Sequence, residues 1–237
     1  MTGRPKARHM ERLAAFVPIE GHLLADIGCG EGSLVRSLTK RGARVIGIDP
    51  NGAQLEKAEA AGPVGSERYL QAGAQSLPLE SGSLDGAIFF NALHHLPLDL
   101  MDAGLAEAAR VLKPGAPLYV LEPIAEGALH DLLAPVDDET FVRAKAEEAL
   151  QRAAALPDWE LLARGEYLGA WKVAGVDSLL AELLRIDPAR RDALEAAEDA
   201  IRRDFDAVVD ERPETGGCLF WLPYRFTVLR RRKAAAR

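Results

Sequence analysis

The stretch LLADIGCGEG at residues 23–32 decides how this chain is expected to fold. It opens with an apolar run and passes into Gly28, Gly30 and Gly32, ahead of a helical stretch from about residue 33 to 41. A short buried strand that turns through glycines into a helix is the first step of a parallel α/β sheet. Glycines let a ligand approach the backbone, and the start of the helix favours an anionic group. A tight strand-to-helix turn without a ligand is the alternative explanation.

The alternation of apolar strands and helices continues outward from this stretch. Further strands are predicted at 43–49, 68–72, 84–92 and 117–123, with helices at 52–61 and 98–112. Apolar strands separated by helices indicate a parallel sheet covered on both faces, and right-handed crossovers make it a doubly wound α/β fold. Ligands in such sheets bind at the carboxyl ends of the strands. The residues that follow each strand are therefore the candidate site residues.

The second half of the chain has a different pattern. Helices are predicted at 137–156 and 187–209, and the segment at 159–171 is left open between a strand and a hairpin. A strand is predicted at 218–232 near the end of the chain. Pro223 interrupts it, which predicts a position at the edge of the sheet.

The composition excludes several classes of protein. The chain has 237 residues, of which 48% are hydrophobic, and a net charge of −7. This is typical of a globular protein, and no run approaches the ~18 apolar residues of a membrane-spanning helix. An acidic chain does not favour nucleic-acid binding, so the basic run at 230–233 is interpreted as a solvated tail. We identify no secretory signal, and the two cysteines, Cys29 and Cys218, fit a reducing cytoplasm, which is the expected location.

An acidic residue closes the second predicted strand. Asp49 follows Gly28 by 21 residues, and a carboxylate there can accept two hydrogen bonds from a ribose diol. The alternative is that Asp49 caps the next helix or belongs to a turn at 49–52. The dinucleotide fingerprint G-x-G-x-x-G would need a glycine where Ser33 stands, which disfavours a nicotinamide cofactor.

Four segments, in this order, resemble the class I S-adenosyl-L-methionine-dependent methyltransferases. LADIGCGEG (24–32) looks like their first motif and VIGIDPN (45–51) like their second. AQSLPLESGSLDGAIFFNALHHL (74–96) is similar to their adenine-contact loop and fourth strand, and AARVLKPGAPLYVLEP (108–123) to their fifth-strand region. The resemblance is greatest to the small-molecule branch. It implies a doubly wound, mostly parallel sheet of the seven-stranded, Rossmann-like type, with S-adenosyl-L-methionine as cofactor and S-adenosyl-L-homocysteine as product.

The resemblance also implies which residues hold the cofactor. They are Asp26, Gly28, Cys29, Gly30, Asp49, Pro50, Ala74, Gln75 and Asn91. Those on the first strand and its loop would face the methionyl end, and Asp49 would take the ribose hydroxyls. Ala74 and Gln75 would contact adenine, while Asn91 would lie near the methionyl group or the sulfonium. Gly73 stands where the family often has an acid for the adenine amine, so that contact is expected from Gln75, from a backbone carbonyl, or not at all.

Two histidines follow the fourth predicted strand and are the candidate bases. A hydroxyl or an acidic carbon must lose a proton when it is methylated, and His95 or, as second choice, His94 would take it. Neighbours in an extended chain point in opposite directions, so at most one is expected to face the substrate. The alternative is that one packs under the loop and the other caps a helix or lines the cofactor. Glu122 either faces the acceptor or is a solvated acid at the end of its strand, and no metal site is expected.

We therefore predict a single methyltransferase domain over residues 1–237. Its parts are a cofactor-binding core at 22–123, a mostly helical acceptor or lid region at 124–217 and a strand completing the sheet at 218–232. The expected reaction is in-line methyl transfer to a small-molecule acceptor, driven mainly by proximity and orientation. A cofactor-binding but non-catalytic regulatory or scaffold protein is the alternative. We expect no nucleic-acid or membrane partner, and the sequence leaves the acceptor atom and the oligomeric state open.

Overall fold

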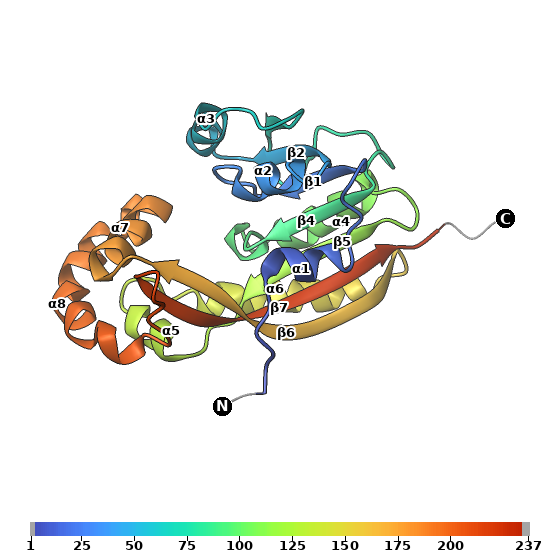
Figure 1. Ribbon diagram of the computed structural model, residues 1–237. Helices are drawn as coiled ribbons and strands as arrows, with labels where there is room; N and C mark the ends of the chain where they lie inside the picture. Colours follow the sequence, from blue (N-terminus) through green and yellow to red (C-terminus); the bar gives the residue numbers. More distant parts are fainter. Residues whose placement is uncertain (1–2, 234–237) are drawn as a thin grey trace. The chain divides into compact units, whose positions relative to one another are not determined.

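The computed structural model describes residues 3–233, in which seven strands form one sheet (Figure 1). The strands are β1 (Leu23–Ile27), β2 (Arg44–Asp49), β3 (Arg68–Gln71), β4 (Gly86–Phe90), β5 (Pro117–Pro123), β6 (Trp159–Val173) and β7 (Cys218–Arg231). Their order is β3-β2-β1-β4-β5-β7-β6, and β1 to β5 pair in parallel. The predicted doubly wound, mostly parallel sheet is confirmed.

Helices connect and cover these strands. They are α1 (His9–Ala14), α2 (Ser33–Thr39), α3 (Gly52–Ala60), α4 (Met101–Val111), α5 (Ala128–Leu133), α6 (Thr140–Ala154), α7 (Val176–Ile186) and α8 (Arg191–Val208), with 3₁₀ turns η1 (Leu93–His95) and η2 (Pro188–Arg190). No pattern in the sequence predicted α1, α5 or α7, and the segment that forms β6 was open between a strand and a hairpin. None of the described helices is long and apolar enough to cross a membrane.

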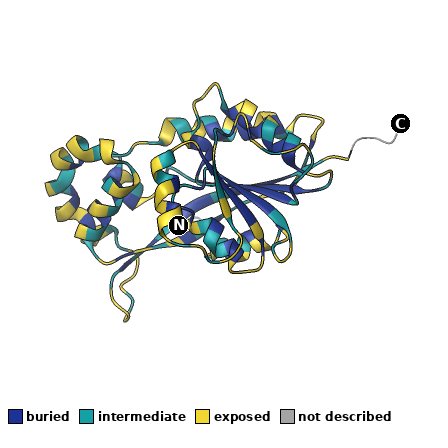
Figure 2. Ribbon diagram, turned by 90° about the horizontal axis from the view of Figure 1, so that it is seen from above, coloured by how far each residue is buried: buried dark blue, intermediate teal, exposed yellow. Residues whose placement is uncertain are grey.

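The alternation of side chains along the strands makes two apolar faces. On one face, Ile27 and Phe89 pack in a single cluster with residues of α4 and α6 such as Leu105 and Leu150. The other face receives the N-terminal segment, where a side chain at Gly86 would touch both Leu24 and Val17. Figure 2 shows the strands as mostly buried and the outer sides of the helices as exposed. The sheet is therefore covered on both faces, as the apolar strands predict.

The position of β7 differs from the prediction. It lies between β5 and β6 rather than at an edge, and β6 is the edge strand at that end of the order. Hydrogen bonds join Arg231 to Ala116 and Ile124 to Pro223, so β7 runs antiparallel to β5. Pro223 lacks an N–H group, but its carbonyl accepts the N–H of Ile124. An interior strand tolerates this proline because only the donor is lost.

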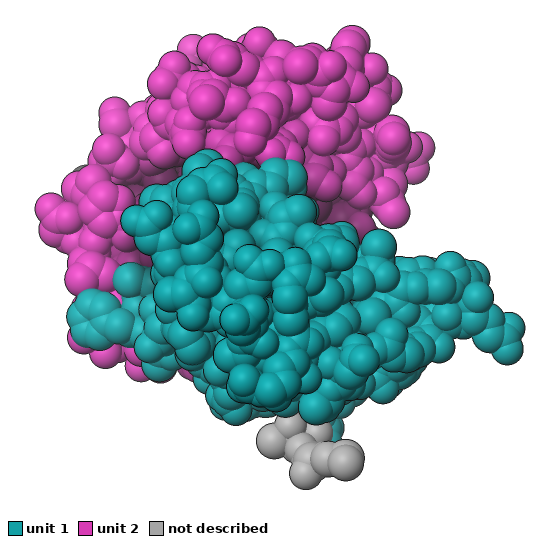
Figure 3. Space-filling view, turned by 90° about the vertical axis from the view of Figure 1, so that its left-hand side faces the viewer, with its two compact units in different colours: residues 1–8, 123–143, 166–224 teal, residues 9–122, 144–165, 225–237 magenta. Residues whose placement is uncertain are grey.

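The chain divides into two compact units (Figure 3). Unit 1 takes the residues up to Arg8 together with Pro123–Arg143 and Glu166–Tyr224, and it has its own apolar cluster around Leu183, Ile201 and Phe220. Unit 2 takes His9–Glu122, Ala144–Gly165 and the residues from Arg225 onward. All of the candidate cofactor-binding residues lie in unit 2.

The strand order fixes where a ligand site can form. The chain leaves β1 toward β2 and β3, then returns to place β4 on the other side of β1. β1 and β4 are neighbours in the sheet, but the chain leaves β1 toward β2 and leaves β4 toward β5. The two loops that follow these strands therefore run in opposite directions from the same edge of the sheet. Such a switch point is where open α/β sheets bind their ligands.

Candidate functional site

The glycine loop after β1 is held against the end of β2. The N–H groups of Gly28 and Cys29 both donate to the carbonyl of Ile48, over 2.7 and 3.1 Å. Gly28 and Gly30 have φ angles of +79° and +49°, which glycine adopts without a Cβ penalty. A Cβ at Gly28 would lie 2.6 Å from the Cβ of Ala92, whereas one at Gly30 would meet no described atom within 4 Å. The loop therefore packs tightly at Gly28 and leaves open space above Gly30.

Asp49 fastens the same loop from the end of β2. Its Oδ2 accepts the N–H of Gly30 over 2.8 Å, and its Oδ1 accepts the N–H of Asn51 over 2.9 Å. The Asp49 side chain thus braces the loop, and the cap of α3 comes instead from Asn51, which accepts the N–H of Ala53. A carboxylate offers about four acceptor positions, so both oxygens can still accept ribose hydroxyls.

Two buried oxygens near the switch point have no hydrogen-bond partner among the described residues. They are Oδ1 of Asp26, on β1, and Oδ1 of Asn91, directly after β4. Burial raises the pKa of Asp26 to about 7, and the negative charge of Asp49 adds to this shift. Asn91 has a φ of +53°, a left-handed conformation that is uncommon for residues other than glycine. An unsatisfied buried carboxylate oxygen is costly, and a bound cation or donor would remove that cost.

The other two residues predicted beside the loop take part differently. The Cys29 side chain is buried, with its Sγ within 2.9 Å of the place where a Cβ on Gly47 would stand, so it packs against β2. Burial also raises the pKa of its thiol, with the charges of Asp26 and Asp49 adding to the effect. Pro50 is exposed, and its carbonyl accepts the Gln71 side-chain amide over 3.1 Å. Cys29 is part of the loop, where its thiol donates to the carbonyl of Gly30 over 3.7 Å, whereas Pro50 directly follows Asp49 at the end of β2.

In the loop after β3, the Gln75 side chain covers Gly73, the position where the resemblance would place an acid. The amide of Gln75 folds back over Gly73, where a Cβ would lie 2.4 Å from its Oε1. Ala74 is buried against α4, where a Cβ on Gly104 would lie 3.3 Å from the Cβ of Ala74. The N–H of Ala72 donates to the carbonyl of Asp49, so this loop starts beside the end of β2. The Gln75 amide therefore occupies the place that a side chain at position 73 would take.

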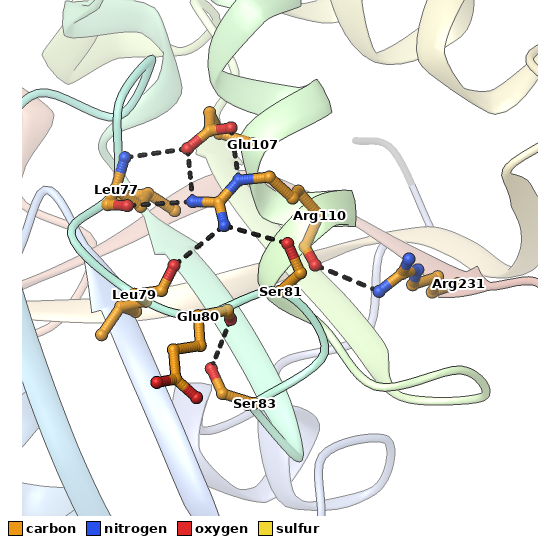
Figure 4. A network of polar contacts seen from close by, with 8 residues as sticks. All are labelled: Leu77, Leu79, Glu80, Ser81, Ser83, Glu107, Arg110 and Arg231. Atoms are coloured by element: carbon orange, nitrogen blue, oxygen red, sulfur yellow. Dashed lines mark hydrogen bonds and ion pairs between the residues drawn. The ribbon is translucent and has the colours of Figure 1, made fainter.

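A pair on α4 braces the following segment, and sequence reasoning missed it (Figure 4). The guanidinium of Arg110 donates to the carbonyls of Leu77 and Leu79, over 2.9 and 2.8 Å. It also pairs with Glu107, whose Oε2 accepts the N–H of Leu77 over 2.9 Å. The hydrogen bond from Arg110, together with that from Leu77, holds the pKa of Glu107 below its usual value. The i,i+3 spacing of an acid and an arginine on a predicted helix was the available signal.

The two histidines lie in η1, a 3₁₀ turn, and not in extended chain. Their ring centroids are 4.0 Å apart, and only His94 is buried, with 3% of its surface exposed, while His95 is exposed. Glu122, at the end of β5, is also buried, and its carboxylate contacts Nδ1 of His94. Its other oxygen accepts the N–H of Leu93 over 3.0 Å. Glu122 is therefore not a solvated acid, and the argument from an extended chain was wrong.

These features fit S-adenosyl-L-methionine on physical grounds. Its methionyl end carries an ammonium group, and Asp26 offers a buried carboxylate oxygen without a partner. Its ribose carries two hydroxyl donors, and Asp49 keeps acceptor capacity on both oxygens. The space above Gly30 would be filled by a Cβ on any other residue. Asp26, Gly30, Asp49 and Asn91 are the residues that would hold the cofactor.

The segment that carries these residues matches a known protein family. Residues 25–120 match the model of the methyltransferase domain family. That segment runs from β1 to β5 and contains the glycine loop, Asp49, both histidines and the Glu107–Arg110 pair of α4. The chain therefore contains a class I S-adenosylmethionine-dependent methyltransferase domain, and its sheet is the Rossmann-like sheet of that class.

Similar proteins point to the same domain. An O-methyltransferase from Pyrenophora dematioidea is 31% identical over 127 residues, which are 52% of this chain and 47% of that protein. A ubiquinone/menaquinone biosynthesis C-methyltransferase from Rhizobium johnstonii is 34% identical over 109 residues, 43% of this chain and 42% of that protein. The chain thus spans about half the length of these relatives. The crystal structure of a candidate methyltransferase from Bacillus halodurans has a TM-score of 0.64 at 15% identity, over 95% of this chain and 99% of that one.

Proposed function

We propose that this protein transfers a methyl group from S-adenosyl-L-methionine to a small-molecule acceptor, with His94 or His95 as the base where the acceptor must lose a proton. The single observation that carries the proposal is the pair of unsatisfied buried oxygens, on Asp26 and Asn91, beside the open glycine loop. Asp26 lies near the end of β1 and Asn91 directly follows β4, the strand that pairs with β1 at the switch point of the methyltransferase domain. A domain that bound no ligand would have no need to keep two costly oxygens unsatisfied at that place.

Each residue has a distinct task in this proposal. When bound, the cofactor supplies an activated methyl group on a sulfonium, so the chain need only bind, orient and exclude water. Asp49 would accept the ribose hydroxyls while it keeps Gly30 in place. Asp26 would face the ammonium group, and the Gln75 amide would contact adenine in place of an acid at Gly73. The histidines of η1 follow β4 at the same edge of the sheet, where an acceptor could lose its proton.

The names of the relatives guide the choice of acceptors to test. They include an enzyme that methylates oxygen and one that methylates carbon in quinone biosynthesis. Both reactions replace a proton on the acceptor by a methyl group. Phenols and hydroxylated quinone precursors are therefore the first small molecules to screen, and nucleic acids are not expected to be methylated by a chain with a net charge of −7.

Calorimetric titration with S-adenosyl-L-methionine, S-adenosyl-L-homocysteine and NADH tests the cofactor. The first two should bind and NADH should not. Asp49→Ala should lose on the order of 2–3 kcal/mol of binding free energy, because bonds to a charged acceptor contribute ~1.5–3 kcal/mol each and do not add fully. Asp158→Ala, which removes an exposed carboxylate away from the loop, should bind like the wild type. Because Asp49 also holds Gly30, thermal denaturation without ligand would separate a loosened loop from lost ribose contacts.

The outcomes distinguish the alternatives. Binding followed by turnover with a phenol or a hydroxyquinone supports the enzyme. Tight binding of both sulfur compounds with no turnover of any acceptor would favour a regulatory or scaffold protein. If neither sulfur compound binds, the proposal is wrong. The glycine at position 73, in place of the acid that the family often has, would then mark the loss of the adenine site.

A further inference from the structure

Glu122 makes two bonds to the turn that carries the candidate bases. β4 and β5 pair in parallel up to Phe90 and Leu121, and the N–H of Asn91 donates to the carbonyl of Leu121 over 2.8 Å. The next residue of β5 is Glu122, so its side chain reaches η1 directly. One carboxylate oxygen accepts the N–H of Leu93 over 3.0 Å, and the other contacts Nδ1 of His94.

The chemistry of this pair fixes the location of one proton. A carboxylate is only an acceptor, and a neutral imidazole has one N–H and one lone pair. Contact between the Glu122 oxygen and Nδ1 of His94 requires the proton to lie on Nδ1. The lone pair that a base needs must then lie on Nε2. The turn is held as well, because Leu93 donates to the same carboxylate, so the ring has a fixed position as well as a fixed tautomer.

We propose that Glu122 is a positioning residue that makes His94, rather than His95, the base of the reaction. The inference rests on the proposed function and names the residue behind the base. A carboxylate with 8% of its surface exposed is costly to bury, and tying β5 to η1 would need only one acceptor for the N–H of Leu93. The second oxygen is directed at a ring nitrogen. The carboxylate therefore provides more than the structural link requires.

The proton transfer balances with the methyl transfer. The bond between the acceptor atom and its hydrogen breaks, and the proton goes to Nε2 of His94. The electron pair left on the acceptor forms the new bond to the methyl carbon, and the pair of the carbon–sulfur bond returns to sulfur. The positive charge thus moves from the sulfonium to the imidazolium, beside the negative carboxylate of Glu122. Orientation and charge stabilisation by a buried acid behind a histidine is an established way to support a base.

The first test observes the tautomer directly and needs neither cofactor nor acceptor. ¹⁵N-labelled histidine in the full chain, assigned with His94→Gln, reports which ring nitrogen carries the proton at a pH where the ring is neutral. The wild type should show His94 protonated on Nδ1. In Glu122→Gln the amide can keep the bond from Leu93 through its oxygen and turn its NH₂ group toward Nδ1, which should move the proton to Nε2. Finding the Nε2–H tautomer in the wild type would overturn the inference, whatever the activity.

The second test separates positioning from structure by kinetics. Glu122→Gln should lower kcat by about 100-fold or more, with the KM of the acceptor and the Kd of S-adenosyl-L-methionine within about 3-fold of wild type. Glu122→Asp keeps the charge and should recover part of the loss. Glu160→Gln, which removes a surface carboxylate paired with Arg230, is the matched control and should leave kcat unchanged. A kcat that survives Glu122→Gln would contradict the inference, and so would a loss with His95→Gln but not with His94→Gln.

Failure of this inference and failure of the proposed function give different results. If the wild type binds no S-adenosyl-L-methionine, the proposed function fails and Glu122 has no base to position. If the wild type binds S-adenosyl-L-methionine, and Glu122→Gln keeps the wild-type kcat and the wild-type tautomer of His94, only the role of Glu122 fails.

Discussion

Asp26 is the candidate cofactor-binding residue whose ionisation is expected to depend on folding. Burial raises its pKa to about 7, well above that of an aspartate in water, so the folded chain holds on to a proton that the unfolded chain releases near pH 4. A raised pKa means that the native state binds more protons in this interval. Stability is therefore greatest below the unfolded pKa and falls as the pH rises through the folded one.

The pH dependence of stability tests this assignment. In the absence of cofactor, we expect the wild type to lose roughly 3 kcal/mol of unfolding free energy between about pH 5 and about pH 8 relative to Asp26→Asn, since each pKa unit is worth ~1.4 kcal/mol. Urea denaturation of both proteins measures the difference. Parallel curves for the two proteins would show that Asp26 titrates normally. Affinity for the cationic cofactor should rise with pH over the same interval in the wild type and stay flat in the variant.

The space above Gly30 gives a second prediction at the scale of one residue. Gly30 and Gly62 both have positive φ angles, +49° and +79°, and a Cβ on either would meet no described atom within 4 Å. Substitution by alanine should cost roughly 1–2 kcal/mol of stability in each case, from backbone strain alone. Only Gly30→Ala is expected to weaken binding of S-adenosyl-L-methionine, by about 10-fold or more, because its methyl group enters the ligand space. Equal affinity in the two variants, measured by calorimetry, would mean that the ligand does not approach Gly30.

Elements with local signals could be predicted from the sequence. β1, β2 and β5 are apolar runs closed by glycine, Asp49 or proline, and the helices between them have regular periodicity, so their order and approximate bounds were predictable. The site at the switch point follows from that order. Asp26 was included on the resemblance to a family, and only the structure adds that one of its oxygens is buried without a partner.

Features that depend on partners far along the chain were not predictable. Pro223 suggested an edge strand, yet its carbonyl accepts a hydrogen bond from the N–H of Ile124, about 100 residues away. The run at 230–233 looked like a solvated tail, but Arg230 pairs with Glu160, and Arg231 donates to the carbonyls of Arg110 and Leu112. The contact of Glu122 with His94 likewise joins two strand ends. No periodicity encodes such pairings, because each is made only when the sheet assembles.

The contribution of the Glu107–Arg110 pair on α4 to holding the segment between β3 and β4 can be measured. Arg110 holds two carbonyls and Glu107 holds one N–H of the segment between β3 and β4. Arg110→Lys keeps the charge but loses the planar fork, so the amides of Leu77 and Leu79 should exchange with solvent about 10-fold faster, equivalent to ~1.4 kcal/mol. Native-state hydrogen exchange measures this. Arg152→Lys, on an exposed pair with Asp102, is the control and should leave those amides unchanged. Unchanged exchange in both variants would mean that the Glu107–Arg110 pair does not hold the loop.

At the scale of the whole molecule, each unit has its own apolar core. In unit 1, the ring of Phe205 packs edge-on against Phe220, with centroids 5.8 Å apart, within a cluster formed by α5, α7, α8 and β7. In unit 2, Phe89 is fully buried beneath α4. Cores that are separate in this way can open separately, as partly independent units of stability. The strands β6 and β7 contribute residues to both units, so the independence is expected to be incomplete.

Cavities made in one core at a time test this division. Phe205→Ala should cost roughly 3–5 kcal/mol in unit 1, and Phe205→Leu distinctly less, because the cost of a core truncation grows with the cavity left behind. Hydrogen exchange should then accelerate in α7 and α8 while β1, β2 and β4 stay protected, and the Kd of S-adenosyl-L-methionine should change by less than about 3-fold. Phe89→Ala should instead expose β1 and β4 and abolish cofactor binding, since all the residues that would hold the cofactor lie in unit 2. If Phe205→Ala weakened cofactor binding as strongly as Phe89→Ala, the two cores would unfold as one, and the shared strands would be rigid enough to transmit the loss.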